Sequence, residues 1–495
     1  MKKNKCFSWA VIALSMATMM TACSSENNEP TPPVNPEENY TWSVDGGLKA
    51  CNNLLFPGNV IGNGDDEFVF VGKQTLPKGI YILKGWVYIA NGAELTIEPG
   101  TIIKGDKTSK AALIVERGGK LIAQGSKDAP IVFTSAQPKG ERKPGDWGGI
   151  ILCGKAPNNQ NEMQIEGGPR TKHGGDNPQD NSGILSYVRI EFAGYPFQAN
   201  QEINGLTLGS VGSGTKIDHV QISYSNDDAF EWFGGTVNCT HIISYKTWDD
   251  DFDTDNGYNG NIQFGLSVRD PKIADTSNSN GFESDNWKDG TNLSPMTSPI
   301  FSNMTFVGPM ALDPNFVNKA GAGEYINAGT YNPNNGAALG RFQAAFHLRR
   351  FTNLSCFNSI AIGYPVGLII ENDKGDAQGA ALKGDIRLQN IWLANVELVG
   401  SDKNSSWSVG ENAFSKTFFE TQTGNKVVET AKLGLKIGSY LNIPCIPTAT
   451  EVFKAASFTD SKLKSFEKTQ YIGAFGNNDN WLAGWTNFDP NQTTY

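Results

Sequence analysis

Short apolar runs alternate with glycine, asparagine and proline from Gly85 onward. Examples lie at 87–89, 95–97 and 113–115, and two similar glycine-rich sequences begin at Asn91 and Arg117, 26 positions apart. Runs this short are typical of β-strands, and their spacing leaves no room for crossover helices. Short strands that return every 20–30 residues or so predict a solenoid, in which each coil buries its inner face against its neighbours.

The middle of the chain repeats one aromatic and acidic element at 227–233, 250–256 and 280–286. In each copy a phenylalanine precedes an acid, and in two copies a second acid follows two positions later. The residues are Phe230 and Glu231, then Phe252, Asp253 and Asp255, then Phe282, Glu283 and Asp285. Alternate side chains of a strand face opposite ways. If the phenylalanines point into the coil, the acids point outward and stack from coil to coil.

The spacing of this element predicts the coil length. Phe230 and Phe252 are 22 positions apart, which matches the coil expected above. The next step, from Phe252 to Phe282, is 30 positions, so we expect an eight-residue excursion to loop out within 269–280. That longer interval decides whether Glu283 belongs to the stack.

Other residues predict columns along the solenoid. His219 and His241 are also 22 positions apart, and without a third metal ligand they indicate a stacked column rather than a metal pair. The Ser-Tyr pairs at 223–224 and 244–245 are only 21 apart, which predicts a bulge between them. Asparagines that precede similar apolar strands predict an amide column; they are Asn303, Asn353 and Asn390.

Aligned carboxylates repel one another, so a patch of them requires a positive counter-charge. A bound cation would supply it, and hard oxygen ligands favour calcium, Ca2+. The predicted calcium ligands are Asp228, Glu231, Asp250, Asp251, Asp253, Asp255, Glu283 and Asp285. The predicted ligand-binding side chains beside them are Trp232, Trp248, Arg269 and Trp287. Two alternatives stay open: Lys246, Arg269 and Lys288 supply the counter-charge, or the acids only end strands and cap turns.

The start of the chain indicates export. Lysines precede an apolar stretch at 7–20, as in a secretory signal. Cys23, directly after Ala22, resembles the lipobox of bacterial lipoproteins, which implies cleavage before Cys23 and an acyl anchor in a lipid bilayer. Residues 24–40 carry four prolines and four acids and predict an extended tether. Acids after a lipidated cysteine also resemble the export signals of Bacteroidetes surface lipoproteins, which implies the outer membrane and its outer face.

The net charge and the cysteine content disfavour two classes of function, nucleic-acid binding and zinc binding. The formal net charge is −10, which disfavours nucleic-acid binding because that requires clustered lysine and arginine. Five cysteines remain after Cys23, and none forms a Cys-x-x-Cys pair, so zinc sites are disfavoured. Cys239 and Cys356 are expected to be buried thiols, and a disulfide of Cys51 or Cys445 stays open.

The coil sequences also show a resemblance to a known family. Residues 95–104 (Leu-Thr-Ile-Glu-Pro-Gly-Thr-Ile-Ile-Lys), 118–125, 130–135 and 146–150 are similar to the first coils of right-handed parallel β-helix lipoproteins of Bacteroidetes. Residues 471–475 and 481–490 resemble the closing segment of the same family. The resemblance covers about 85–490 and implies an all-β fold, a right-handed parallel β-helix.

Both ends of such a stack need caps, because open strand edges would otherwise pair with other chains. We therefore expect a signal peptide (1–22), a lipid-anchored tether (23–40), an N-terminal cap (41–84), the β-helix (85–401) and a C-terminal cap (402–495). The patterns at 427–433 and 452–456 suit short helices in the second cap. Trp481 and Trp485 are expected to cover the last coil.

Three classes of function remain. The first is a binding module that presents a calcium-stiffened face to a glycan, a peptide or a partner protein. The second is a polysaccharide lyase or glycosidase, with Lys246, Arg269, Arg349 or Arg350 as a base, or Asp228 and Glu231 as a hydrolytic pair. The third is an accessory subunit of an outer-membrane complex, such as one with a TonB-dependent receptor. Many acids without an outstanding base favour binding over catalysis.

Overall fold

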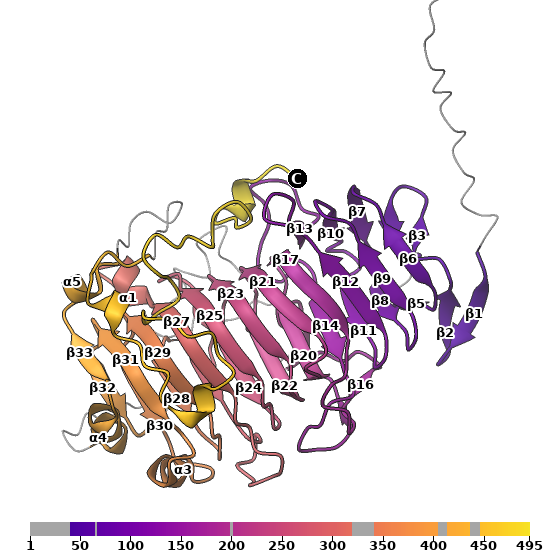
Figure 1. Ribbon diagram of the computed structural model, residues 1–495. Helices are drawn as coiled ribbons and strands as arrows, with labels where there is room; N and C mark the ends of the chain where they lie inside the picture. The colour runs from indigo at the N-terminus through magenta and orange to yellow at the C-terminus, as the bar shows by residue number, and fades with distance from the viewer. Residues whose placement is uncertain (1–39, 65–66, 199–200, 319–340, 404–412, 436–445) are drawn as a thin grey trace, which may run out of the picture. The chain divides into compact units, whose positions relative to one another are not determined.

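The computed structural model describes residues 40–64, 67–198, 201–318, 341–403, 413–435 and 446–495. The described residues form one compact unit, whose backbone winds through two long sheets as a coil (Figure 1). Cys6, Cys23 and the segment predicted as signal peptide and tether, up to residue 39, lie outside the described residues, as does Cys445. No described helix is long and apolar enough to cross a membrane.

Sheet A takes one strand from each coil. In the order of hydrogen-bonded neighbours, its strands are β1 (Trp42–Asp45), β2 (Leu48–Cys51), β5 (Glu67–Phe70), β8 (Trp86–Ile89), β11 (Ala112–Val115), β14 (Gly149–Cys153), β20 (Leu206–Val211), β22 (Phe230–Gly235), β24 (Phe252–Asp255), β26 (Phe282–Ser284), β28 (Ala344–Leu348), β30 (Val366–Ile370) and β32 (Leu398–Ser401). From β2 onward neighbouring strands are parallel, with one coil between them.

Sheet B runs beside it through the same coils. Its main path is β3 (Leu55–Phe56), β4 (Val60–Ile61), β7 (Ile80–Leu83), β10 (Ile102–Gly105), β13 (Ile131–Ser135), β17 (Gly183–Glu191), β21 (Lys216–Ser223), β23 (Asn238–Tyr245), β25 (Asn261–Val268), β27 (Ile300–Val307), β29 (Ser355–Ile362), β31 (Leu388–Ala394) and β33 (Lys426–Val428). A branch of β6 (Lys73–Leu76), β9 (Glu94–Ile97) and β12 (Lys120–Gln124) joins it at β17. Strand β17 pairs with β12 along its first half and with β13 along its second, so it merges two faces of the earlier coils.

The merged strands bend at one position, which forms a column. The residue at each bend has a positive φ; these residues are Tyr187, His219, His241, Phe264, Asn303, Asn358 and Asn390. Histidine and asparagine are among the residues that tolerate this conformation best, which explains their recurrence. Rings stack in the first part of the column, with centroids 4.3 Å apart for His219 and His241. In the last part, the Asn390 amide donates to Asn358 Oδ1 at 3.1 Å.

This column confirms the stacked histidines and corrects two other predictions. Asn358, and not Asn353, continues the column from Asn303, because Asn353 lies before the start of β29. The bulge predicted from the Ser-Tyr pairs is wrong. Ser223 pairs with Tyr245, 22 positions on, so the two Ser-Tyr sequences are not equivalent in the register.

The inside of the coil is apolar and aromatic. Phe230, Phe252, Phe282 and Phe346 are neighbours in sheet A, and all four are buried. The centroids of Phe230 and Phe252 lie 5.7 Å apart. Full burial of such a side chain contributes roughly 1.5–3 kcal/mol, so this column strongly favours the observed register over a slipped one.

Short helices and two hairpins lie in the segments that connect the strands of the coil or follow its last strand. The helices are α1 (Pro309–Leu312), α3 (Ala377–Lys383), α4 (Phe414–Thr421), α5 (Thr430–Leu433) and the 3-10 turns η3 (Val452–Lys454), η4 (Ser461–Leu463) and η5 (Pro490–Gln492). The hairpins are β15 (Met163–Gln164) with β16 (Lys172–His173) and β18 (Pro196–Gln198) with β19 (Gln201–Glu202). The Asp376 carboxylate caps α3 by accepting from Gly379 N–H at 2.8 Å, and Gly384 ends the helix with φ 81°.

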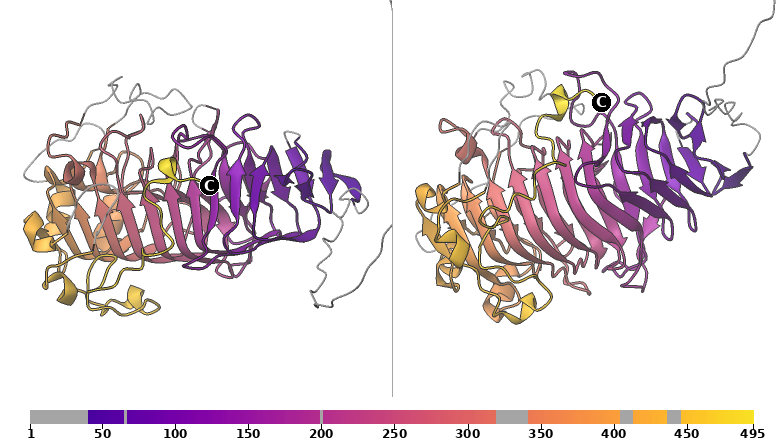
Figure 2. Two further views of the ribbon diagram at one scale, coloured as in Figure 1. Left: turned by 90° about the horizontal axis from the view of Figure 1, so that it is seen from above. Right: turned by 45° about the horizontal axis from the view of Figure 1, so that its top comes forward.

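The C-terminal segment 446–495, which we call the strap, runs back along sheet B toward the early coils (Figures 1 and 2). Ser457 bonds to Asn358, Trp481 packs across His241, and Tyr495 bonds to Glu191. Trp481 and Trp485 therefore cover middle coils, and the prediction that they cover the last coil is wrong.

The observed boundaries differ from the predicted caps. Strands β5 to β7, within 67–83, already belong to the coil. The antiparallel pairs β1–β2 and β3–β4 form the N-terminal end, and β2 and β4 join the parallel ladders through β5 and β7. In the C-terminal region α5 and η3 overlap the short helices expected at 427–433 and 452–456, but the first of these stretches begins in strand β33, and α4 was not predicted. Cys51, Cys153, Cys239 and Cys356 are buried free thiols.

Candidate cation-binding face and an adjoining pocket

The outward row of acids is in register. Glu231 pairs with Asp253, and Asp253 pairs with Glu283, on β22, β24 and β26. The row continues to Thr207 on β20 and to His347 on β28. Glu283 therefore joins the stack, because the longer interval is taken up between the end of β25 at Val268 and the start of β26 at Phe282.

A second row, one turn earlier, forms a ladder of side-chain oxygens. The N–H of Asp228 donates to Asn204 Oδ1 (3.2 Å), that of Asp250 to Asp228 Oδ1 (2.7 Å), that of Asn280 to Asp250 Oδ1, and that of Ala344 to Asn280 Oδ1 (3.1 Å). Each Asp or Asn thus ties its turn to the next coil through one oxygen. This is the turn-capping alternative raised for these acids, and it leaves the second oxygen of each carboxylate for another partner.

The two rows bring carboxylates within reach of one ion. Three sets made of carboxylates alone have ligand atoms within 4.8 Å of one another: Asp227, Asp228 and Asp249; Asp228, Glu231 and Asp253; Asp250, Asp253 and Glu283. A fourth set lies on β21 and β23 of sheet B, where Asp218 supplies the third ligand beside His219 and His241 that the sequence did not show. Calcium binds oxygen at about 2.3–2.6 Å, so two oxygens of one ion lie at most about 4.6–5.2 Å apart. The separations fit that sphere. We call the seven acids of the three carboxylate sets the acidic face.

The electrostatics of the acidic face are unfavourable without a cation. Burial, and then the charges of neighbouring acids, raises the pKa well above its usual range for Asp228, Glu231, Asp250, Asp253 and Asp255, which follows Asp253 by two positions on β24. The same holds for Asp249. Asp253 Oδ1 is buried and has no hydrogen-bond partner among the described residues. A metal ion would replace the protons that these carboxyls otherwise favour.

Cationic side chains neutralise one end of the face. Arg349 donates to Glu283 and, at 2.8 Å, to Asp285, and Arg350 donates to Asp285 at 2.5 Å. Burial alone would raise the pKa of Glu283, but Arg349 and His347 lower it to about 2. His347 lies between Glu283 (3.3 Å) and Glu371 (3.5 Å), and these contacts raise its pKa against the effect of burial.

The predicted calcium ligands thus divide into three groups. Asp228, Glu231, Asp250, Asp253 and Glu283 come together on the acidic face. Asp255 and Asp285 stand at its edge, and Asp285 is held by the two arginines. Asp251 does not belong to the face: Arg269 donates to it at 3.1 Å, both side chains are fully buried, and Ser244 donates to it at 2.6 Å.

Most of the predicted ligand-binding side chains are inaccessible, and the structure corrects that prediction for three of them. Trp232 (0 % exposed), Trp248 (1 %) and Arg269 (0 %) are buried and offer no surface to a ligand. Trp232 stacks on Phe230 inside the coil, with centroids 5.7 Å apart. Trp287 alone of the four is partly exposed, with Lys288 5.5 Å from its ring centroid.

Arg349, His347 and Glu371 are the residues of this site whose position the sequence reasoning missed. A signal for two of them exists, because Phe346-His347-Leu348-Arg349 has the same spacing as Phe282-Glu283-Ser284-Asp285. The register aligns them, with Phe346 opposite Phe282 and His347 opposite Glu283. The fourth copy of the element therefore carries cations where the others carry acids.

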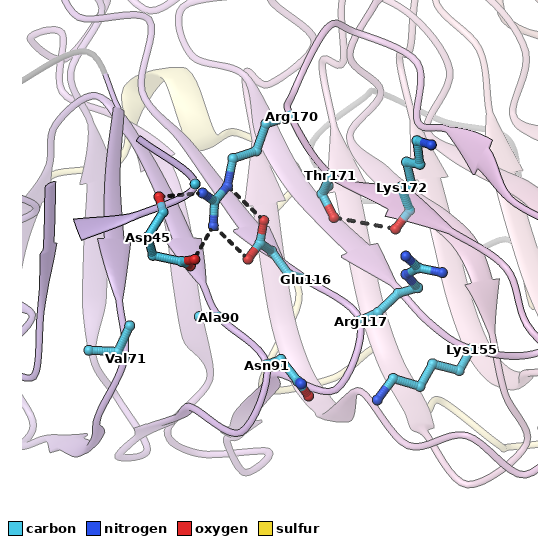
Figure 3. Close-up of a pocket in the computed structure, with 11 residues that line it drawn as sticks. Asp45, Val71, Ala90, Asn91, Glu116, Arg117, Lys155, Arg170, Thr171 and Lys172 are labelled. Carbon is cyan, nitrogen blue, oxygen red and sulfur yellow. Dashed lines mark hydrogen bonds and ion pairs between the residues drawn. The ribbon is translucent and has the colours of Figure 1, made fainter. Parts of the chain in front are cut away.

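A pocket of about 850 Å3 lies farther toward the N-terminal end of sheet A (Figure 3). Segments that follow β1, β5, β8, β11 and β14 line it together with the β15–β16 hairpin. Its polar side chains are Asp45, Asn91, Glu116, Arg117, Lys155, Arg170, Thr171 and Lys172. Sequence reasoning did not find it, because these residues come from separate segments that share no repeat.

Comparison with protein families agrees with this architecture. The model of a pectate-lyase-like β-helix domain matches residues 70–436, well over half of the chain. The chain belongs to this family. The match confirms the predicted parallel β-helix, and membership of a Bacteroidetes lipoprotein family stays a prediction. Comparisons with curated proteins and with solved structures gave no further match.

Proposed function

We propose that the chain is an exported ligand-binding lipoprotein whose acidic face binds calcium and, through the calcium, a glycan. The observation that carries the proposal is the in-register row of Glu231, Asp253 and Glu283 beside Asp228 and Asp250, with oxygens spaced for one ion. Calcium takes six to eight oxygen ligands, roughly, so an ion held by three carboxylates keeps positions for oxygens of a bound ligand. Sugar hydroxyls suit these positions.

The anchor and the location belong to the same proposal. The lysine-rich start, the apolar run and Cys23 support export and acylation, and the acids after Cys23 support the outer face of the outer membrane. The tether would then hold the β-helix near the bilayer while leaving sheet A free to meet a ligand. A peptide or an outer-membrane partner protein is the alternative occupant, and the net charge of −10 argues against nucleic acid.

Catalysis by a polysaccharide lyase is less well supported, because the residues considered as bases are bound to acids. Lys246 lies 3.1 Å from Asp270, with 4 % of each side chain exposed. Arg269 pairs with Asp251, and Arg349 and Arg350 pair with Asp285. The acids raise the pKa of Arg349 well above its usual range, which makes it a poorer proton acceptor. These contacts favour binding over proton abstraction.

Thermal unfolding with calcium and with a chelator tests the calcium site. We expect calcium to raise the melting temperature by several degrees, since a ligand at 100 times its Kd adds about 2.7 kcal/mol to the free energy of unfolding. Asp228→Asn and Asp253→Asn should each abolish most of that gain. They should also raise the melting temperature in chelator, because each removes a carboxyl whose ionisation burial and the neighbouring acids oppose by raising its pKa.

Asp289→Asn is the matched control, because Asp289 is exposed and lies outside the acidic face. Identical melting curves in calcium and chelator would refute the calcium site. A glycan array in calcium and in chelator then tests the ligand, and signals that disappear in chelator support the proposal. Release of unsaturated or reducing ends from an acidic-polysaccharide panel would instead establish an enzyme.

A further inference from the structure

The pocket in Figure 3 is a second site, separate from the acidic face, and it is lined by cations. Its lining holds four cationic side chains, Arg117, Lys155, Arg170 and Lys172, and two acids, Asp45 and Glu116. The chain as a whole carries a net charge of −10. A local excess of positive charge in an acidic protein therefore needs a specific explanation.

Arg170 forms hydrogen-bonded ion pairs with both acids of the pocket, Glu116 and Asp45. Arg170 donates through Nε and Nη2 to the two oxygens of Glu116, each at 2.9 Å. The same side chain donates to the Asp45 carbonyl at 2.8 Å and to Asp45 Oδ2 at 2.9 Å. This network makes Arg170 a fixed part of the wall and leaves the other three cations without an acid from the lining.

Two of these cations share a single carboxylate outside the lining. Arg117 Nη2 lies 2.5 Å from Glu162 Oε1, and Lys172 Nζ lies 3.4 Å from Glu162 Oε2. The Gly174 carbonyl accepts another N–H of Arg117 at 3.1 Å, which fixes the orientation of the guanidinium. Glu162 is about half exposed, so it compensates the pair only weakly.

Although its charge opposes the rise that burial causes in the pKa of Asp180, Lys155 forms no ion pair with an acid in the described part of the chain. It follows β14, is partly buried, and its backbone is fixed because its carbonyl accepts the Asn177 N–H at 2.9 Å. Its ammonium lies close to the Asn91 amide: a Cβ on Gly118 would lie 2.7 Å from Lys155 Nζ and 2.1 Å from Asn91 Oδ1. Glycine at 118, with φ +88°, is what leaves room for these two polar tips.

From these contacts we infer that the pocket binds a small ligand through an oxyanion, held between Lys155 and Arg117 with Asn91 beside them. A carboxylate, sulfate or phosphate group has the acceptor oxygens that match a guanidinium edge and an ammonium. The volume of about 850 Å3 falls in the range of small-molecule sites. Val71, 41 % exposed, gives the rest of the ligand an apolar surface. This inference does not depend on calcium.

Calorimetric titration at low salt tests the site with three probes of similar size: glucuronate, glucose 6-phosphate and neutral glucose. We expect at least one of the two anions to bind at least tenfold more tightly than glucose. Lys155→Met and Arg117→Met should each weaken that binding by tenfold or more. Lys139→Met is the control, because Lys139 is exposed and lies outside the pocket.

Titrations in chelator keep the two sites distinct, because no residue of the acidic face lines the pocket. Preference for glucuronate identifies a sugar acid, and preference for glucose 6-phosphate identifies a phosphorylated ligand. The inference fails if neither anion binds more tightly than glucose, or if both variants bind as the wild type does. Such a failure leaves the calcium-dependent melting gain unaffected.

Discussion

At the scale of single residues, buried acids of the acidic face have pKa values shifted in opposite directions, depending on the charges beside them. Asp253 lies among acids, so burial and repulsion raise its pKa, and its proton-bound form is favoured in the folded state. Glu283, one coil later, lies against Arg349 and has a pKa of about 2, so it stays ionised. Neighbours in one row thus have opposite preferences, and the difference comes from the cations beside Glu283, Arg349 first and then His347.

These opposite shifts predict how stability depends on pH. A raised carboxyl pKa contributes stability below the unfolded pKa, near 4, that is lost as the pH rises through the folded pKa. His347, whose pKa is also raised, adds a loss in the same direction above about pH 6.5. Glu283 acts oppositely, since its contribution is lost only as the pH falls toward 2. In chelator we therefore expect the melting temperature to fall between pH 5 and 8.

Asp253→Asn isolates the contribution of the face to that slope. The variant should show a shallower decline than the wild type in chelator, and calcium should flatten the wild-type decline because the ion displaces protons. Melting temperatures at four pH values, with calcium and with chelator, give both comparisons. Equal slopes for the variant and the wild type would contradict the raised pKa of Asp253.

At the scale of strands and turns, the ladder from Asn204 to Asn280 connects successive coils by a hydrogen bond from each turn to the next. Asn280 makes the last step of this ladder: its Oδ1 accepts the N–H of Ala344, which lies 64 positions later in the chain. Asn280→Ala leaves that buried N–H without its acceptor, which costs roughly 1–3 kcal/mol. We expect a lower urea midpoint for this variant. Asn292→Ala, at an exposed position in a connecting segment, should change the free energy of unfolding by no more than about 0.5 kcal/mol.

The strands also show why sequence predicted part of the site. Phe230, Phe252 and Phe282 repeat because the coil interior accepts one large side chain at each level, so their spacing gave the correct register for the acids beside them. Burial of Trp232 follows from the same alternation, because Trp232 lies two positions after Phe230 and shares its inward face. Trp248 lies between β23 and β24, where no strand alternation applies, so its burial was not predictable in this way. The insertion at 154–182, which helps to form the pocket, follows no repeat at all.

At the scale of the whole molecule, the strap connects the last coils to the early ones. Its final residue lies against strands far away in sequence: the Lys104 ammonium donates to the Tyr495 main-chain oxygen at 2.9 Å. The Tyr495 hydroxyl donates to Glu191, 2.6 Å from one oxygen and 2.7 Å from the other. Arg142 donates to the Pro490 and Thr493 carbonyls at 2.6 and 3.0 Å. A solenoid is normally held together only by contacts between neighbouring coils, and the strap adds contacts across many of them.

Tyr495→Phe tests whether the strap is docked as described. Glu191 is fully buried, and a hydrogen bond to a charged group contributes about 1.5–3 kcal/mol, so loss of the hydroxyl should weaken docking by about 2 kcal/mol. Amide exchange at Asn487, whose N–H donates to Gln221 Oε1 at 2.9 Å, should then become about 30-fold faster. Tyr195→Phe is the control, because no hydrogen bond of the Tyr195 hydroxyl occurs among the described residues. Equal exchange at Asn487 in Tyr495→Phe and the wild type would show that the strap holds without this contact, and the stabilisation would then lie in the packing of Trp481 and Trp485 on the histidine column.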